Sequence, residues 1–100
     1  MLLEVKSNSD VDDKRTTPFL ICFTSSWCGA CKKVKPVLEE FSKQMDVYLL
    51  DVNDWPKHVE KYNINVIPTI FFIKDNDIKE KVTGYKTMFD LVTIKSNLGF

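Results

Sequence analysis

Two cysteines, Cys28 and Cys31, are separated by the small residues Gly29 and Ala30 and lie between an apolar run and a long amphipathic run. A disulfide needs Cβ atoms about 3.5–4.5 Å apart, whereas neighbours three apart in a regular helix have Cβ atoms about 5–6 Å apart. The gap closes if Cys28 stands at the helix N-terminus, outside regular helical geometry. Gly29 and Ala30 are small enough to allow that turn. The spacing therefore indicates dithiol–disulfide chemistry.

A cysteine in this position is also activated as a nucleophile. Free backbone N–H groups and the positive end of the helix dipole point at the Cys28 sulfur. They favour the thiolate, which is the attacking species in disulfide exchange. A Cys-x-x-Cys between a strand and a helix is a signature of redox sites, so a redox pair is the first hypothesis for this chain.

A structural disulfide and half of a metal site are the other interpretations of the pair. Zinc needs roughly four ligands, and the spare candidates, Cys22 and His58, fall on a buried strand and a distant helix. We therefore expect no metal, and we expect Cys22 to be a small buried hydrophobe. Lysines 32, 33 and 35 are interpreted as a solvated helix face that adds some positive field near Cys28.

Hydrophobic periodicity predicts the elements that position the motif. The predicted elements, in chain order, are strand 2–6, a short helix within 7–15, strand 19–23, helix 28–45 with Pro36 inside it, strand 47–52, helix 56–62, a hairpin of strands 69–73 and 78–82, and helix 87–98. Strand–helix–strand repeats favour parallel pairing with right-handed crossovers, and the hairpin adds antiparallel strands. The prediction is an α/β fold with a central mixed five-stranded sheet flanked by helices on both faces.

Two helices carry more detailed predictions. Pro36 should bend the first long helix. Thr87 and Asp90 resemble a capping box that opens the last helix. The residues predicted on the inner stripe of that helix are Met88, Leu91, Val92, Lys95 and Leu98.

Length and composition exclude several classes of protein. One hundred residues predict a single domain over 1–100, and the formal net charge of zero, with interleaved signs, argues against nucleic-acid binding. No apolar run approaches the roughly 18–20 residues of a membrane span. An odd count of three cysteines and an N-terminus without signal-peptide character favour a reducing compartment, hence the cytoplasm.

Further motifs give a resemblance to a known family. They are Trp27-Cys28-Gly29-x-Cys31-Lys32, Pro36 five residues after Cys31, Val66-Ile67-Pro68-Thr69, and Gly84 after the hairpin. Together with the order of elements, they make the chain similar to the thioredoxin family from Leu2 to Leu98. A lone Cys-x-x-Cys would be a weak signal, but its combination with Ile-Pro-Thr before a strand about 40 residues on is specific.

The resemblance implies a protein-disulfide reductase that maintains cell redox homeostasis. It implies that Cys28 attacks, that Cys31 resolves, and that the Ile67–Pro68 bond is cis with the Ile67 backbone beside the disulfide. The residues implied to border the substrate-docking surface are Trp27, Gly29, Ala30, Ile67, Pro68, Gly84 and Tyr85. It also implies a monomer without bound cofactor that acts on protein disulfides and receives electrons from an NADPH-dependent thioredoxin reductase.

Three residues depart from the family pattern. Ala30 replaces the usual proline between the cysteines, so we expect a shifted, modestly more oxidising potential. Cys22 stands where the family has a buried aspartate, and Leu49 where it commonly has a partner lysine. The joint loss avoids a lone buried charge, but it removes the usual proton carrier for Cys31. Two alternatives stay open: a disulfide donor or isomerase, and a non-catalytic thioredoxin-fold interaction subunit.

Overall fold

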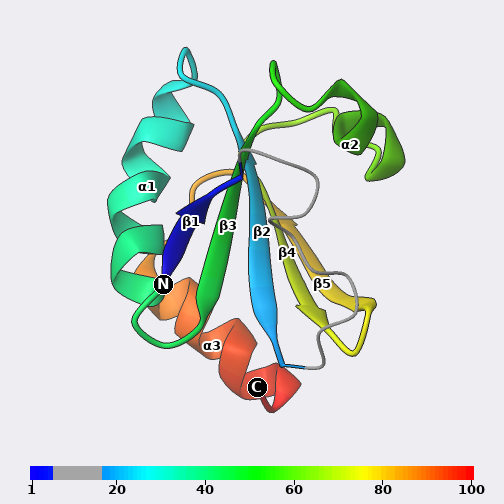
Figure 1. Cartoon of the computed structure of the whole chain (residues 1–100). Helices are drawn as coiled ribbons and strands as arrows, with labels where there is room; N and C mark the ends of the chain where they lie inside the picture. The colour runs from blue at the N-terminus through cyan, green and yellow to red at the C-terminus, as the bar shows by residue number, and fades with distance from the viewer. Residues whose placement is uncertain (6–16) are drawn as a thin grey trace.

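A five-stranded sheet organises the structure, a computed structural model that describes residues 1–5 and 17–100. The strands are β1 (Leu2–Glu4), β2 (Phe19–Thr24), β3 (Asp46–Asp51), β4 (Thr69–Lys74) and β5 (Asp77–Thr83), and the helices are α1 (Gly29–Phe41), α2 (Pro56–Lys61) and α3 (Met88–Leu98). The spatial order is β1-β3-β2-β4-β5 (Figure 1). β1, β3 and β2 are parallel, and β4 and β5 are added antiparallel, which confirms the predicted mixed sheet.

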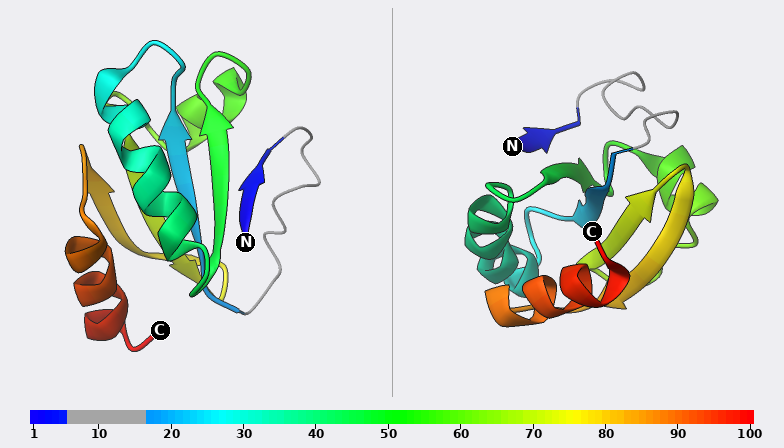
Figure 2. Two further views of the ribbon diagram at one scale, coloured as in Figure 1. Left: turned by 90° about the vertical axis from the view of Figure 1, so that its left-hand side faces the viewer. Right: turned by 90° about the horizontal axis from the view of Figure 1, so that it is seen from below.

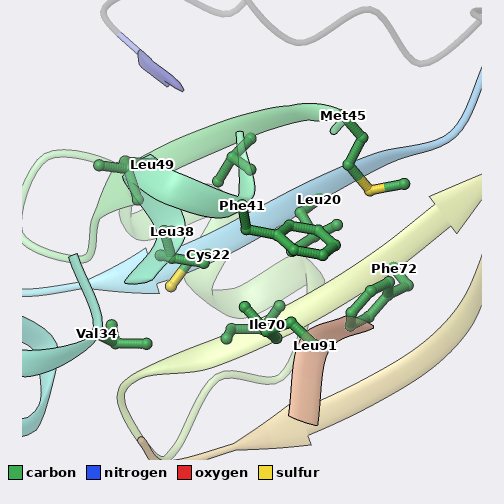
Figure 3. Close-up of a cluster of buried hydrophobic side chains, with 11 residues drawn as sticks. Leu20, Cys22, Val34, Leu38, Phe41, Met45, Leu49, Ile70, Phe72 and Leu91 are labelled. Atoms are coloured by element: carbon green, nitrogen blue, oxygen red, sulfur yellow. The ribbon is translucent and has the colours of Figure 1, made fainter. Parts of the chain in front are cut away.

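The central strands are covered on both faces because alternate side chains point to opposite sides of the sheet. One core contains Leu20 and Cys22 of β2 with α1 and Leu91 of α3, and Figure 3 shows these side chains meeting. The other core contains Phe19, Ile21 and Phe23 with the apolar side of α2. Figure 2 shows α1 and α3 on one side of the sheet and α2 on the other, as predicted.

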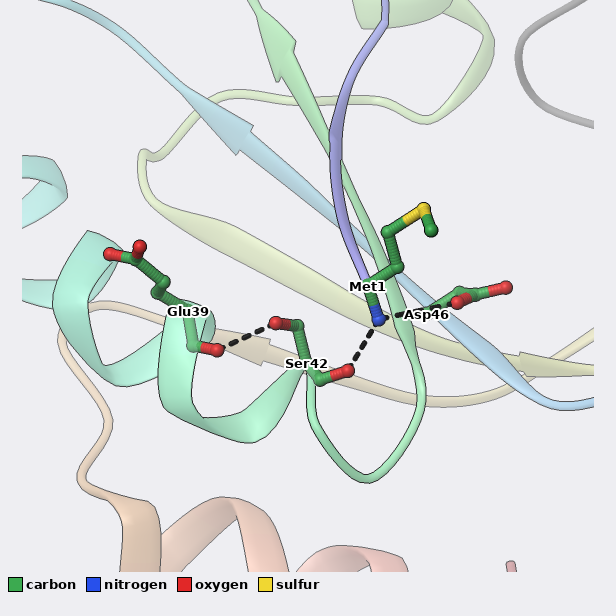
Figure 4. A network of polar contacts seen from close by, with 4 residues as sticks. All are labelled: Met1, Glu39, Ser42 and Asp46. Carbon is green, nitrogen blue, oxygen red and sulfur yellow. Dashed lines mark hydrogen bonds and ion pairs between the residues drawn. The ribbon is translucent and has the colours of Figure 1, made fainter.

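Helix α1 is shorter than predicted. It includes Pro36 but ends at Phe41, not at residue 45. Ser42 is the C-cap, its hydroxyl donates to the Glu39 carbonyl, and its own carbonyl accepts from the Met1 amine, which also contacts Asp46 (Figure 4). The predicted end was wrong because Met45 falls at helical spacing after Phe41 in the sequence, although it lies in the turn after the helix. The capping contacts end the helix, so the chain reverses into β3.

The structure confirms the predicted start of helix α3, but not every residue predicted on its inner stripe. The Thr87 hydroxyl accepts from the Asp90 N–H at 3.2 Å, and the Asp90 carboxylate accepts from the Thr87 N–H at 3.0 Å. Val92 is 39 % exposed, and Ile94 packs on the core instead. A position one residue past the buried Leu91 is rotated about 100° around the helix axis, which carries Val92 to solvent.

The other boundaries differ from prediction by one or two residues. β1 is described over Leu2–Glu4, and α2 begins at Pro56, a favoured first helical residue. The short helix predicted within 7–15 lies outside the described residues. Among the residues that are described, no helix combines the length and the apolar character that crossing a membrane requires.

Candidate active site

Cys28 is the last residue of the connection from β2 to α1, directly before the first helical residue, Gly29. It is the N-cap, with extended backbone angles of φ −94° and ψ 119°. Its N–H donates to the Ser25 carbonyl at 3.4 Å, and the Trp27 N–H donates to the Ser25 hydroxyl oxygen at 3.3 Å. Ser25 is buried. The loop therefore anchors Cys28 outside regular helical geometry, as the spacing predicts.

The two motif sulfurs have opposite environments. The Cys31 N–H donates to the Cys28 Sγ at 3.2 Å. The Cys31 thiol, followed by the backbone N–H groups of Cys31 and Ala30, lowers the pKa of Cys28 by hydrogen bonding to its thiolate. Cys31 is fully buried, and that burial, followed by the hydrogen bond to Cys28, raises its pKa to about 11. One sulfur is thus prepared to attack while the other is held as a thiol.

This asymmetry predicts selective alkylation. A lowered pKa means that Cys28 becomes a thiolate at lower pH than a free cysteine, whose pKa is about 8.5. Iodoacetamide should therefore modify Cys28 alone near neutral pH, with a midpoint below that of free cysteine, while the buried Cys31 and Cys22 stay unmodified. Peptide mass spectrometry across a pH series measures this. Modification of two sites at pH 7, or a midpoint at or above that of free cysteine, would contradict it.

A second loop meets the motif from the start of β4. The Cys28 Sγ lies 3.9 Å from the carbonyl oxygen of Ile67. The Ile67–Pro68 peptide bond is cis, as the resemblance implies. The Gly84 N–H donates to the Pro68 carbonyl at 2.8 Å, and Gly84 has a φ of +80°, a conformation that favours glycine. Residues distant in sequence are therefore linked at one end of the sheet.

An apolar groove of about 210 Å³ runs beside this loop. Its lining residues are Trp27, Val52, Val59, Ile64, Asn65, Val66 and Ile67. Trp27 is 69 % exposed, which is unusual for so large an apolar side chain. Three of these residues, Val52, Val59 and Ile64, were not predicted from the sequence; they come from the β3–α2 connection, from α2 and from the segment after it. No local pattern separates them from ordinary core residues.

The remaining sequence candidates are placed apart from the reacting sulfurs or within the core. Cys22 is fully buried and lies opposite Leu49 in the β2–β3 register. Burial, followed by the nearby Cys31, raises the pKa of Cys22. His58 lies on α2, edge-on to the Trp55 ring. Across residues 1–5 and 17–100, no three side chains of the kinds that ligate metals are grouped together.

Comparisons with known proteins agree with the geometry. The sequence profile described as Thioredoxin matches residues 3–96. A thioredoxin from Staphylococcus epidermidis is 34 % identical over 93 residues, which cover 88 % of this chain and 89 % of that protein. A chloroplastic M-type thioredoxin from Spinacia oleracea is 34 % identical over 92 residues, covering 80 % and 51 %. A mutant thioredoxin from Halobacterium salinarum superposes with a TM-score of 0.85 at 27 % identity, covering 95 % and 88 %.

Proposed function

This chain belongs to the thioredoxin family of protein-disulfide oxidoreductases, and from that premise we propose that Cys28 and Cys31 carry out its disulfide-reductase activity. The observation that carries this proposal is the asymmetry of the pair. Cys28 is partly exposed at a helix N-terminus with a lowered pKa, and Cys31 is buried with a raised pKa. A nucleophile needs the first environment, and a resolving thiol is compatible with the second.

Each cysteine then has one step. The Cys28 thiolate attacks one sulfur of a substrate disulfide, forming a Cys28–substrate disulfide and releasing the other substrate sulfur as a thiolate, which takes a proton. Cys31 loses its proton and attacks the Cys28 sulfur. The mixed disulfide breaks, the second substrate thiolate leaves, and Cys28–Cys31 is oxidised. Two electrons have moved from the protein to the substrate.

The substrate chain docks over the motif and the loop around Pro68. The groove beside Trp27 and Ile67 supports this proposal, since it is apolar and the carbonyl oxygen of Ile67, one of its lining residues, lies 3.9 Å from the Cys28 sulfur. The Ile67 backbone pairs with an extended substrate segment, while Gly29, Ala30 and Gly84 border the docking surface without large side chains. The partners are therefore proteins with accessible disulfides.

The protein's wider context follows from the same chemistry. We propose that an NADPH-dependent thioredoxin reductase restores the dithiol, and that the chain acts as a monomer in a reducing compartment, the cytoplasm. An odd number of cysteines supports that compartment. Two cores on one shared sheet support a single domain over residues 1–100. If the oxidised protein does not accept electrons from such flavoproteins, the proposal of a thioredoxin reductase as its electron donor is wrong.

Ala30 stands where the family usually has proline, a position that influences the reduction potential of the cysteine pair. Measuring that potential therefore distinguishes a reductase from a disulfide donor or isomerase. We expect equilibration against defined thiol–disulfide buffers to give a value close to the thioredoxin end of the scale, about −270 mV, and modestly more oxidising than it. Ala30→Pro should then make the potential more reducing. A value near about −180 mV would instead favour a donor or isomerase.

A further inference from the structure

The three lysines that follow the motif do not share one environment. Lys32 and Lys33 are exposed, but Lys35 is half-buried. Lys35 lies four residues after Cys31 in α1, so the two side chains leave the same face of the helix, with Cβ atoms about 5–6 Å apart. The interpretation of all three as one solvated face is therefore wrong for Lys35, which covers the sheet beside the buried sulfur.

Lys35 reaches a polar pocket at the carboxyl ends of the parallel strands. The pocket has a volume of about 240 Å³, and its lining includes Lys35, Glu4 at the end of β1, Thr24, Leu49, Asp51 and Asp54. A lysine can bury its aliphatic stem while its ammonium stays hydrated. The pocket suits a half-buried lysine of this kind, because its lining offers apolar Leu49 to the stem and hydrophilic side chains to the ammonium. Among the described residues, none forms an ion pair with Lys35.

The charge of Lys35 acts on the buried side of the motif. It lowers the pKa of Cys31 and of Cys22, and it is not among the causes that shift the pKa of Cys28. The other charged groups that face it, Glu4, Asp51 and Asp54, have the opposite sign. Glu4 and Asp54 are exposed, so solvent screens them from the buried thiol.

We propose that the Lys35 ammonium, carried by α1 over the pocket at the ends of β1 and β3, supplies the positive charge that promotes the attack of Cys31 in the second step. The proposal rests on the proposed function. Cys22 and Leu49, which lie opposite each other on β2 and β3, provide no pair of charges on the sheet. The positive charge comes instead from Lys35 on α1, the helix that covers this face of the sheet. Lys35 acts through Cys31 without touching substrate, so it is a positioning residue.

The second step is where this charge matters. When Cys28 is bonded to substrate, its thiolate no longer disfavours a second negative charge nearby, and burial remains as the opposing cause. Cys31 gives its proton to solvent, and its thiolate attacks the Cys28 sulfur while the substrate thiolate leaves. Lys35 favours the anion that forms, so the attack begins from a larger thiolate fraction.

Stopped-flow reaction with Ellman's reagent tests this on the intact protein. Attack by Cys28 releases one thionitrobenzoate and leaves a mixed disulfide, and attack by Cys31 releases the second. We expect Lys35→Met to slow the second release about three- to tenfold at pH 7 and to displace its pH profile to higher pH. Lys33→Met, which removes an exposed lysine from the same helix, should change it less than about twofold. Lys35→Arg should retain the wild-type rate.

The two phases separate the possible failures. The first release and the alkylation profile of Cys28 should be unchanged in Lys35→Met, and Lys35→Gln provides a second neutral variant if that protein folds poorly. Equal second phases in Lys35→Met and Lys33→Met, or equal losses in both phases, would overturn the role of Lys35. A wild-type protein that never releases the second thionitrobenzoate would instead refute the roles assigned to the two cysteines.

Discussion

Cys28→Ser should abolish disulfide reduction, with turnover lowered by at least about a thousandfold, because a serine hydroxyl does not ionise near neutral pH and cannot form a disulfide. The reason is structural as well as chemical. Cys28 is partly exposed, and its sulfur accepts a hydrogen bond from the Cys31 N–H and lies beside the Ile67 carbonyl oxygen. Reduction of insulin disulfides, coupled through a flavoprotein reductase to NADPH consumption, measures the loss.

Two other cysteine variants make the assignment specific. Cys31→Ser should complete the first step but not the second, so a covalent Cys28–substrate adduct accumulates and is seen by non-reducing electrophoresis. Cys22→Ser should retain most of the turnover, since Cys22 lies within the core. Substantial turnover in Cys28→Ser would show that Cys28 is not the nucleophile, and an adduct attached at Cys31 would show that the roles of the two cysteines are reversed.

Cys22→Asp is expected to destabilise the protein by about 2–4 kcal/mol at pH 7, because it buries a carboxyl group without a cationic partner on the sheet. Cys22 is fully buried, and its neighbour in the β2–β3 register is Leu49. Urea denaturation of the variant and the wild type gives the difference in free energy of unfolding. A cost below about 1 kcal/mol would mean that Lys35 or solvent already accommodates the charge.

The pH dependence of this cost has a definite sign. Burial raises the pKa of an aspartate in the folded state above its unfolded value of about 3.9. The variant therefore binds more protons when folded, and its relative stability falls as pH rises from about 4 towards 7. Leu49→Lys on the same chain should recover part of the loss at pH 7. A cost that is independent of pH would indicate a packing defect rather than a buried charge.

The spacing of residues along the chain was enough to predict the chemistry and most of the fold. Cys28 and Cys31, with small residues between them, allow few other interpretations once a buried strand precedes them and an amphipathic helix follows. These patterns are informative because strand and helix periodicities differ and because a helix N-terminus stabilises an anion. The errors of the sequence-based prediction were local: the end of α1, Val92 in place of Ile94, and Lys35 as part of a solvated helix face.

Contacts between distant segments were decided by the tertiary structure. The approach of Ile67 to Cys28, the groove formed with Val52 and Val59, and the placement of Lys35 over the pocket depend on how α1, α2 and the strand ends pack. A lysine on an amphipathic helix has the same sequence pattern whether it faces water or the margin of the sheet. The sequence by itself determined which sulfur chemistry this protein performs. Packing decided which charges and surfaces surround those sulfurs, because burial is a property of the assembled fold.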